Sequence, residues 1–547
     1  MAVPTAGSPD SPPAPRLCNR CKEAEATLDL RTAETVCQSC FANYVSTKAI
    51  KRLEVMQRET RTAGHRLPPG AGAAPAPQRY VVALSCGPSS TALLHILYES
   101  LRRHEQQGQG EDLEQGMGKA QTQRQRQKQK QKQQAKPRFE MRAVHVVFDA
   151  DDAGDDDDDE DVNGAHDGGV EQRHYYHRSH GGHYRYHQAG TDRLLDRYRA
   201  RFPGLEIEAV GLSSVVGSPS IDWSALPLTT PPPPAPVAPT TTSAPTADPT
   251  RDTRRRRKQL AEIFARLPSA TSRADVQRLL TRHALLAAAA AEKEVQAQAQ
   301  AQAHDGRDQG QNGQDVVLLL GHSTTALAAL TLSEAAKGRG FSLPWVVNDG
   351  AAFPVASPTA ETKTATTATT DVPVYYPLRE IFRKELLAYA SNTTPPLTDI
   401  LSPPTGTDNS SGGGDAGAAA VVSHKDLSID DVMARYFGEV EASYPSVVAN
   451  VVRTTGKLAR TAPTAGAADG SDDRKDGREE EAAAEGGESE GLVVEGLGGG
   501  RCGLCGIALD KSGDARWRGE IGEEGSSDET TAWRRGLCYG CERSTRA

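Results

Sequence analysis

The chain has 547 residues, of which 37% are hydrophobic and only 5% aromatic, so its long Ala-, Gly-, Pro-, Gln-, Thr- and Asp-rich stretches cannot bury enough apolar surface to fold. No run approaches the roughly 20 apolar residues of a membrane helix, and the first residues lack the apolar core of a secretion signal, so we expect a cytoplasmic protein without a membrane partner. The net charge of −9 reflects one acidic run, 149–161, with ten carboxylates. Basic residues cluster in 48–61, 119–142 and 251–258, which leaves local contact with a phosphate backbone open.

Apolar runs alternate with segments of helical periodicity along the middle of the chain. This order predicts an α/β domain with a mainly parallel sheet that is covered by helices on both faces. In chain order we expect strand 80–85, helix 89–103, strand 142–148, helix 191–202, strand 205–212, a helical region 256–296, strand 316–320, and helices 323–337, 377–390 and 430–455.

Composition also divides the chain into domains and linkers. Residues 17–60 form an N-terminal cysteine module with a basic helix, 79–455 form the α/β domain, and 501–547 form a C-terminal cysteine module. The ends and connections 1–16 and 456–500 are expected to be disordered. The domain is interrupted by low-complexity inserts that we expect to be disordered surface loops, at 105–137, 149–190, 225–255, 287–314, 355–371 and 393–425.

Eight of the nine cysteines form four C-x-x-C pairs, a spacing that turns both sulfurs toward one metal ion. Two pairs complete a tetrahedral site, so the sequence predicts two structural zinc ions. Disulfides are the alternative, but a reducing compartment disfavours them. A site shared with a partner chain also stays open. The expected ligands are Cys18, Cys21, Cys37 and Cys40 at one end, and Cys502, Cys505, Cys538 and Cys541 at the other.

A loop of small residues, 85–90, joins the first strand of the domain to a helix. Such a loop offers backbone N–H groups and the positive end of a helix to a phosphate, although an ordinary tight turn has the same pattern. The loop resembles the S-G-G-x-D-S signature of the ATP pyrophosphatase, or PP-loop, family. Cys86 stands where that signature has its first glycine, and Ser89 stands where it has its acid. The matching positions are Ser85, Cys86, Gly87, Ser89 and Ser90.

A second PP-loop signature, G-H-N-x-D-D-x-A-E-T, is similar to residues 321–330, where Gly321 and His322 keep the family residues. The paired acids are replaced by Thr325 and Ala326. Because Mg²⁺ needs oxygen ligands of this kind, the loss of the acids argues against nucleotide turnover. No cysteine lies between Cys86 and Cys502 to serve as a sulfur nucleophile, so no catalytic residue is expected.

Taken with the terminal cysteine pairs, FANYVSTKAIKR, GHSTTALA and PLREIFRKELLAYA, the chain resembles the cytoplasmic tRNA 2-thiolation protein 2 family. The resemblance implies a degenerate PP-loop fold and a non-catalytic subunit. It also implies a catalytic PP-loop paralogue as partner, which uses ATP and transfers sulfur from a thiocarboxylated ubiquitin-related modifier. The product would be wobble 2-thiouridine (U34) in tRNAs of the Lys, Glu and Gln type. Two other functions stay open: an ATP-dependent tRNA sulfurtransferase acting alone, and a zinc-module adaptor in protein modification.

Three basic residues beside the first cysteine module, Lys48, Lys51 and Arg52, are candidate RNA contacts because a zinc module would fix their position. Their alternative is a merely solvated helix face. For the arginine run 254–257, a solvated linker is the favoured interpretation.

Overall fold

The structure of the protein is a computed structural model of the whole chain. The structure describes residues 16–30, 34–64, 78–113, 139–150, 177–178, 184–185, 188–229, 249–303, 316–351, 355–356, 369–370, 372–401, 427–458, 501–507 and 536–546. No helix within these ranges is long and apolar enough to cross a membrane.

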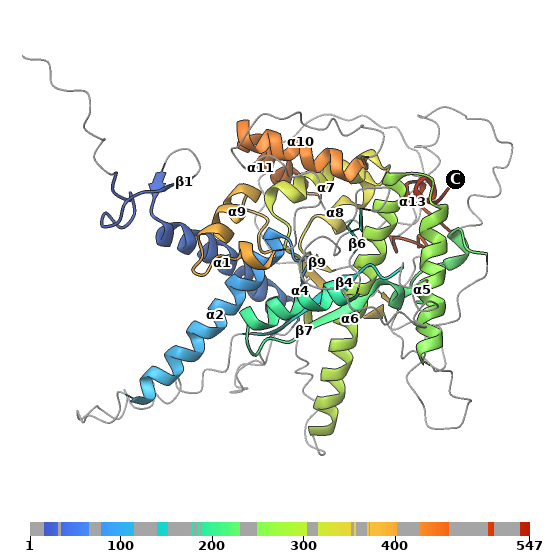
Figure 1. Cartoon of the computed structure of the whole chain (residues 1–547), viewed down its shortest axis with the longest axis horizontal. Coiled ribbons are helices and arrows are strands. Elements are labelled where there is room, and N and C mark those ends of the chain that lie inside the picture. The colour runs from blue at the N-terminus through green and yellow to red at the C-terminus, as the bar shows by residue number, and fades with distance from the viewer. Residues whose placement is uncertain are drawn as a thin grey trace, which may run out of the picture.

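The centre of the molecule is a six-stranded sheet in the order β7-β4-β3-β8-β12-β9 (Figure 1). All neighbouring pairs are parallel except β12 and β9, which pair antiparallel at one edge. The predicted α/β class with a mainly parallel sheet is therefore confirmed. The strands are β3 (Gln78–Ala83), β4 (Phe139–Val147), β7 (Ile207–Gly211), β8 (Val316–Leu319), β9 (Gly350–Ala351) and β12 (Pro373–Tyr375).

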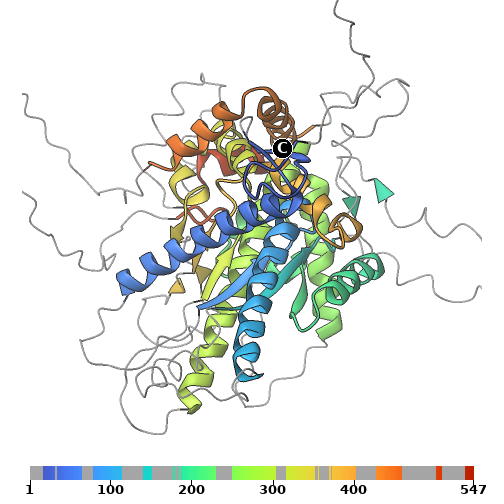
Figure 2. The same ribbon diagram turned by 90° about the vertical axis from the view of Figure 1, so that its left-hand side faces the viewer.

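Helices cover both faces of the sheet because the side chains of its central strands alternate between two apolar clusters. On β3, Tyr80 and Val82 point into one cluster, and Val81 points into the other. The first cluster is completed by α1 (Gln38–Gly64), α2 (Pro88–Leu113), α4 (Gln188–Arg201) and α9 (Arg383–Asn392), of which α1 and α2 lie toward the viewer in Figure 2. The second is completed by α6 (Ala270–Ala303), α7 (Thr324–Ala336), α10 (Ile429–Ser443) and α11 (Pro445–Thr455).

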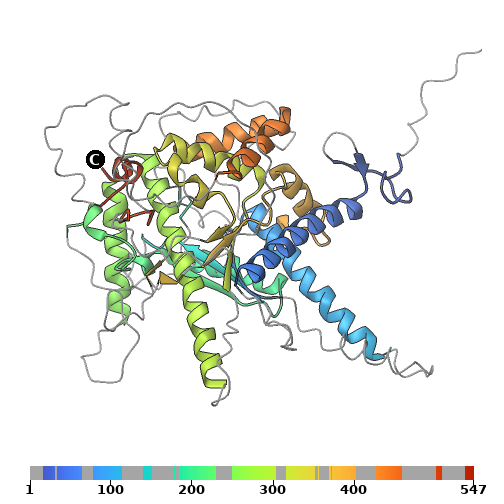
Figure 3. The ribbon, with the colours of Figure 1, turned by 180° about the vertical axis from the view of Figure 1, so that it is seen from behind.

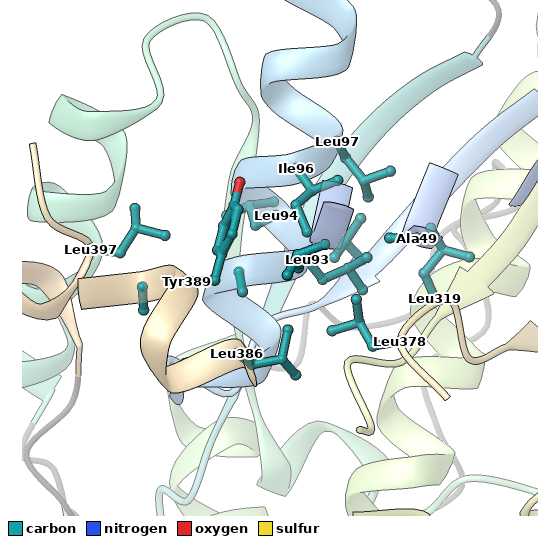
Figure 4. Packing of buried hydrophobic residues seen from close by; sticks show 14 of the residues in the cluster. Ala49, Leu93, Leu94, Ile96, Leu97, Leu319, Leu378, Leu386, Tyr389 and Leu397 are labelled. Carbon is teal, nitrogen blue, oxygen red and sulfur yellow. The ribbon is translucent and has the colours of Figure 1, made fainter. Parts of the chain in front are cut away.

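The first cluster joins the N-terminal segment to the domain. Ala49 of α1 lies close to Leu93 of α2, and Leu386 and Tyr389 of α9 lie on the other side of α2 (Figure 4). The N-terminal cysteine segment is thus packed on the domain through its helix.

A third cluster lies between α5 (Pro249–Arg266), the first half of α6 and the C-terminal cysteines. Trp223 contributes to it together with Leu504 and Leu537 of the last segment. The remaining elements are short: β1 (Leu28–Leu30), β2 (Glu34–Val36), β5 (His177–Arg178), β6 (Tyr184–Arg185), η3 (Leu212–Val215), η4 (Trp223–Ala225), η5 (Gly340–Ser342), α8 (Leu343–Val346), β10 (Val355–Ala356), β11 (Thr369–Thr370), η6 (Thr398–Ile400) and α13 (Tyr539–Thr545).

Three helix predictions need correction, and proline explains two of them. The region 256–296 is two helices, α5 and α6, with Pro268 between them, and 430–455 is broken at Pro445, which opens α11. The predicted helix 377–390 begins only at Arg383, because the carbonyls of the preceding residues Arg379 and Ile381 accept hydrogen bonds from Thr324 instead.

Several segments assigned to disordered inserts are partly structured. Helix α6 continues through 287–303, where alanine favours helix and Ala289 and Ala290 are buried. Helix α2 extends to Leu113, α5 begins at 249, and α4 begins at 188. Residues 393–401 pack on the domain through Leu397, which is fully buried. The other parts of these inserts mostly lie outside the described residues.

Candidate metal centres and degenerate nucleotide loop

The strand order places the two PP-loop-like signatures side by side. β3 and β8 are adjacent central strands, and the connections from them run in opposite directions across the sheet. In open parallel sheets ligands bind at such a switch point, outside the carboxyl ends of the strands. The loop 85–90 follows β3 and the loop 321–323 follows β8, so both expected loops reach this position.

The first loop keeps a glycine-like backbone at Cys86, whose φ of 57° is rare for a residue with a side chain. The Cys86 sulfur is fully buried, 3.7 Å from Nδ1 of His145. Burial raises the pKa of the Cys86 thiol to about 12, so it stays protonated and is a poor nucleophile. The Ser85 and Ser90 hydroxyls lie 3.0 Å apart, and Ser85 is exposed. What remains is a small hydroxyl-lined turn at the start of α2.

The second signature packs directly against the first. A Cβ atom at Gly321 would lie 2.8 Å from the Cα of Ser90 and 3.3 Å from the carbonyl carbon of Ser89, so only glycine fits there. The His322 ring packs edge-on against Tyr376. Burial lowers the pKa of His322 to about 4, which keeps the imidazole neutral at physiological pH.

Thr325, which stands at one of the two acidic positions of the second signature, makes contacts within the protein. The Thr325 hydroxyl donates to the carboxylate of Glu441, which is buried and comes from α10. The other oxygen of Glu441 accepts from the backbone N–H of Lys384 at 2.9 Å, and the N–H of Arg383 donates to the Thr325 hydroxyl at 3.1 Å. Helix α10 therefore holds α7 and α9 together where the paired acids of the PP-loop signature would lie. Glu441 could not be identified from the sequence, because it lies 116 residues from Thr325 along the chain.

The N-terminal cysteines meet around the β1–β2 hairpin, which pairs Leu28 with Val36 and so carries Cys37 back to the first C-x-x-C turn. All four sulfurs lie within 4.8 Å of one another, and those of Cys21 and Cys37 are 3.8 Å apart. Burial raises the pKa of Cys18, but hydrogen bonds from backbone N–H groups outweigh burial and lower this pKa to about 6. For Cys40, the neighbouring Cys37 sulfur and burial raise the pKa to about 12. The negative charge of one thiolate thus disfavours ionisation of the next thiol, and a bound cation would stabilise all four as thiolates.

The C-terminal cysteines also converge within 4.8 Å, and all four are buried. The sulfurs of Cys505 and Cys538 are 3.8 Å apart. Hydrogen bonds from the other thiols lower the pKa of Cys502 well below its usual range, and the hydrogen bond to Cys502 raises that of Cys505 well above it. The predicted grouping of the cysteines is confirmed at both ends, and each group can hold a metal ion.

The C-terminal group is anchored on the domain by a buried charge cluster. Arg339 places one guanidinium nitrogen 3.9 Å from the Cys541 sulfur and forms ion pairs with Asp275 and Glu334. A Cβ atom at Gly540 would lie 2.5 Å from the Arg339 side chain, so the last C-x-x-C turn fits closely against this arginine. Burial raises the pKa of Glu334, but Arg278, Arg339 and Lys337 outweigh it and lower the pKa to about 2, so the carboxylate stays charged.

The three basic candidates on α1 are not equivalent. The ammonium of Lys48 donates to the Glu380 carbonyl at 2.8 Å, and Arg52 forms a short ion pair with Asp349. Lys51 is exposed. Two of the three predicted RNA contacts are therefore already engaged within the protein.

Comparisons with known proteins agree on one family. The family model for cytoplasmic tRNA 2-thiolation protein 2 matches residues 428–543. Proteins of that name are similar to this chain in Sclerotinia sclerotiorum, at 30% identity over 440 residues covering 80% of each chain, and in Phaeosphaeria nodorum, at 28% identity over 533 residues covering 96% of this chain and 94% of the relative.

Among solved structures, a U34-tRNA thiolase from Methanococcus maripaludis with its [4Fe-4S] cluster covers 80% of this chain and 86% of its own. Its identity of 12% and TM-score of 0.36 are too low to inform the chemistry of this chain. The assignment follows from the sequence relatives: at this identity and coverage, the chain belongs to the cytoplasmic tRNA 2-thiolation protein 2 family.

Proposed function

We propose that the chain is the non-catalytic subunit of a cytoplasmic complex that 2-thiolates the wobble uridine of tRNAs of the Lys, Glu and Gln type. Its partner is a catalytic PP-loop paralogue, which uses ATP and takes sulfur from a thiocarboxylated ubiquitin-related modifier. Family membership supports the role in tRNA thiolation. The contact between Thr325 and Glu441 supports the non-catalytic assignment most directly, because it fills the place of the Mg²⁺-binding acids.

We further propose that both cysteine groups hold zinc in a structural role. Four sulfurs around zinc at about 2.3 Å form a tetrahedron with edges of about 3.8 Å. This value matches the 3.8 Å between Cys21 and Cys37 and between Cys505 and Cys538. Zinc would draw the four thiolates of each group together and contribute folding free energy at both ends of the domain.

The role in the complex is tested by mass spectrometry of tRNA from cells that lack the chain. We expect wobble 2-thiouridine to disappear and to return when the chain is supplied again. If 2-thiouridine persists at its normal level, the subunit role is wrong. If it persists while conjugates of a ubiquitin-related modifier are lost, an adaptor in protein modification becomes the better interpretation.

The non-catalytic assignment is tested with the purified chain alone. We expect neither conversion of ATP to AMP nor thiolation of tRNA, although the loop at the start of α2 can still bind a phosphate through backbone N–H groups. Turnover that is abolished by Ser85→Ala or Ser90→Ala would instead identify an autonomous sulfurtransferase.

A further inference from the structure

Helix α5 carries a row of exposed cations along one face. Arg251, Arg255 and Lys258 are all exposed, and their spacing of four and three residues places them on the same side of the helix. Within the described part of the chain, none of the three has an ion-pair partner. Their charge is therefore available to an external ligand.

The acids of α5 do not offset this row, because both are paired elsewhere. Asp252 forms an ion pair with Arg256 at 3.0 Å, and Glu262 forms one with Arg266 at 3.0 Å. On the opposite face, Leu260, Ile263 and Phe264 are buried in the third apolar cluster. The packing of that face fixes which side of α5 is presented to solvent.

The neighbouring arginine of α5, Arg256, does not belong to this exposed row. Arg256 is only 8% exposed, and its Nη2 atom is buried with no hydrogen-bond partner among the described residues. Its Nη1 atom reaches the carbonyl of Ser214, an exposed residue of η3. Because Arg256 is buried and pairs with Asp252, it helps to pack α5 against the domain and does not add to the exposed row.

Helix α5 lies on the side of the sheet formed by the carboxyl ends of the parallel strands, where ligands of open α/β folds bind. Arg257 lies 3.3 Å from Asp149, which follows the carboxyl end of β4, and Asp149 also accepts from the backbone N–H of Ser213 after β7. The degenerate loop of β3 opens at the same edge. Figures 1 and 3 show α5 and α1 at opposite sides of the molecule, so α5 is a surface separate from the N-terminal helix.

We propose that the exposed face of α5 binds the sugar-phosphate backbone of the tRNA substrate. The inference rests on the proposed function, which supplies the RNA. From Arg251 to Lys258 the row spans about 10 Å at 1.5 Å per residue, enough to reach successive phosphates of one strand. The contact is electrostatic and independent of sequence: it holds the RNA at the carboxyl edge of the sheet while another part of the complex selects the uridine.

The test compares two charge-reversed variants of the full-length chain. The α5 variant is R251E/R255E/K258E, and the control is R435E/R453E/K457E, which reverses three exposed cations on and after α10 and α11. Binding of purified tRNA is measured at several salt concentrations. We expect the α5 variant to lose at least about tenfold in affinity at low salt, and the slope of log K against log salt to shrink by about 2 to 3. The control should keep both values.

Equal tRNA binding by the α5 variant and the unmodified chain would overturn the proposal, as would an unmodified chain that binds no tRNA at low salt. Polyglutamate that displaces tRNA as effectively as unlabelled tRNA would overturn it in favour of an acidic protein partner. In cells, the α5 variant should restore less wobble 2-thiouridine than the control variant. If deletion abolishes wobble 2-thiouridine and the α5 variant restores it fully, only the proposal of an RNA-binding surface on α5 is wrong. If 2-thiouridine survives deletion of the chain, the proposed function itself is wrong.

Discussion

Gly321 is the residue at which the two signature loops touch. A Cβ atom there would lie 2.8 Å from Cα and 3.0 Å from N of Ser90, and both are backbone atoms that cannot move aside cheaply. We expect Gly321→Ala to lower the free energy of unfolding by about 1–3 kcal/mol. Gly438→Ala is the matched control, because a Cβ atom meets nothing within 4 Å there and alanine favours helix α10 by up to about 1 kcal/mol. Urea denaturation should therefore show changes of opposite sign, and equal effects would contradict the close approach.

Arg52 and Lys51 are neighbours with different expected roles. Arg52 is 30% exposed and pairs with Asp349, which also pairs with Arg379 at 2.8 Å, whereas Lys51 is exposed. We expect Arg52→Glu to destabilise the protein by about 1–2 kcal/mol, because it places a second carboxylate beside Asp349. Lys51→Glu should change stability by less than about 0.5 kcal/mol. Thermal unfolding of the two variants measures the difference. If Arg52→Glu leaves the stability unchanged, the ion pair with Asp349 does not hold Arg52, and this arginine is again a candidate RNA contact.

The sequence alone did not separate these two side chains. Composition and helical periodicity placed Lys48, Lys51 and Arg52 on one basic helix, but their availability depends on Glu380 and Asp349, which lie about 300 residues away along the chain. The same limit applies to Arg251, Arg255 and Lys258, which become a surface only once the buried face of α5 is known.

Among the elements, α10 contacts α7 and α9 through one buried carboxylate, in addition to the apolar packing of Phe437 and the ion pair of Asp430 with Lys337. Glu441 accepts from both Thr325 and Lys384, so Glu441→Ala leaves a buried hydroxyl and a backbone N–H without their acceptor. We expect a loss of about 2–4 kcal/mol and faster amide hydrogen exchange in α10 and α11. Glu439→Ala on the same helix is the control, since Glu439 is exposed and should be within about 0.5 kcal/mol of neutral. Unchanged exchange in α10 after Glu441→Ala would contradict this attachment.

The elements that the sequence predicted well are those with a strong local pattern. Four apolar runs were predicted correctly as the strands β3, β4, β7 and β8: 80–85, 142–148, 205–212 and 316–320. Each strand is either largely buried itself or, as for β7, pairs with a buried strand. β9 and β12 were missed because two or three residues give no periodicity.

The candidate site was predictable to the same extent. The C-x-x-C spacing and the small-residue loop are local features: the structure brings two cysteine pairs together at each end of the chain, and it packs the loop 85–90 against Gly321. Long-range partners carry no such signal: Thr325 and Glu441 are 116 residues apart, and Arg339 and Cys541 are 202 residues apart.

At the scale of the whole molecule, the two cysteine groups stabilise different parts of the fold. Cys18 and Cys37 belong to the apolar cluster shared by α1, α2 and α9, whereas all four C-terminal cysteines belong to the cluster of α5 and the first half of α6. The C-terminal segment also receives a hydrogen bond at Leu504 from His283 of α6, at 2.8 Å. The end of the chain therefore completes the side of the domain that presents the α5 row.

This division leads to a prediction about metal loss. We expect about two zinc ions per chain and about one in either Cys21→Ser or Cys541→Ser, because three thiolates hold structural zinc poorly. Loss at Cys541 should leave Arg339 without its sulfur neighbour and speed amide exchange in α5, α6 and α13, with a lower melting temperature. Loss at Cys21 should speed exchange in β1, β2 and α1 and leave α5 protected. Mass spectrometry measures the zinc content of each variant, and amide hydrogen exchange shows which elements have lost protection. If α5 lost protection equally in the two variants, the two ends would form one cooperative unit, and the C-terminal metal would have no specific part in holding the proposed RNA surface.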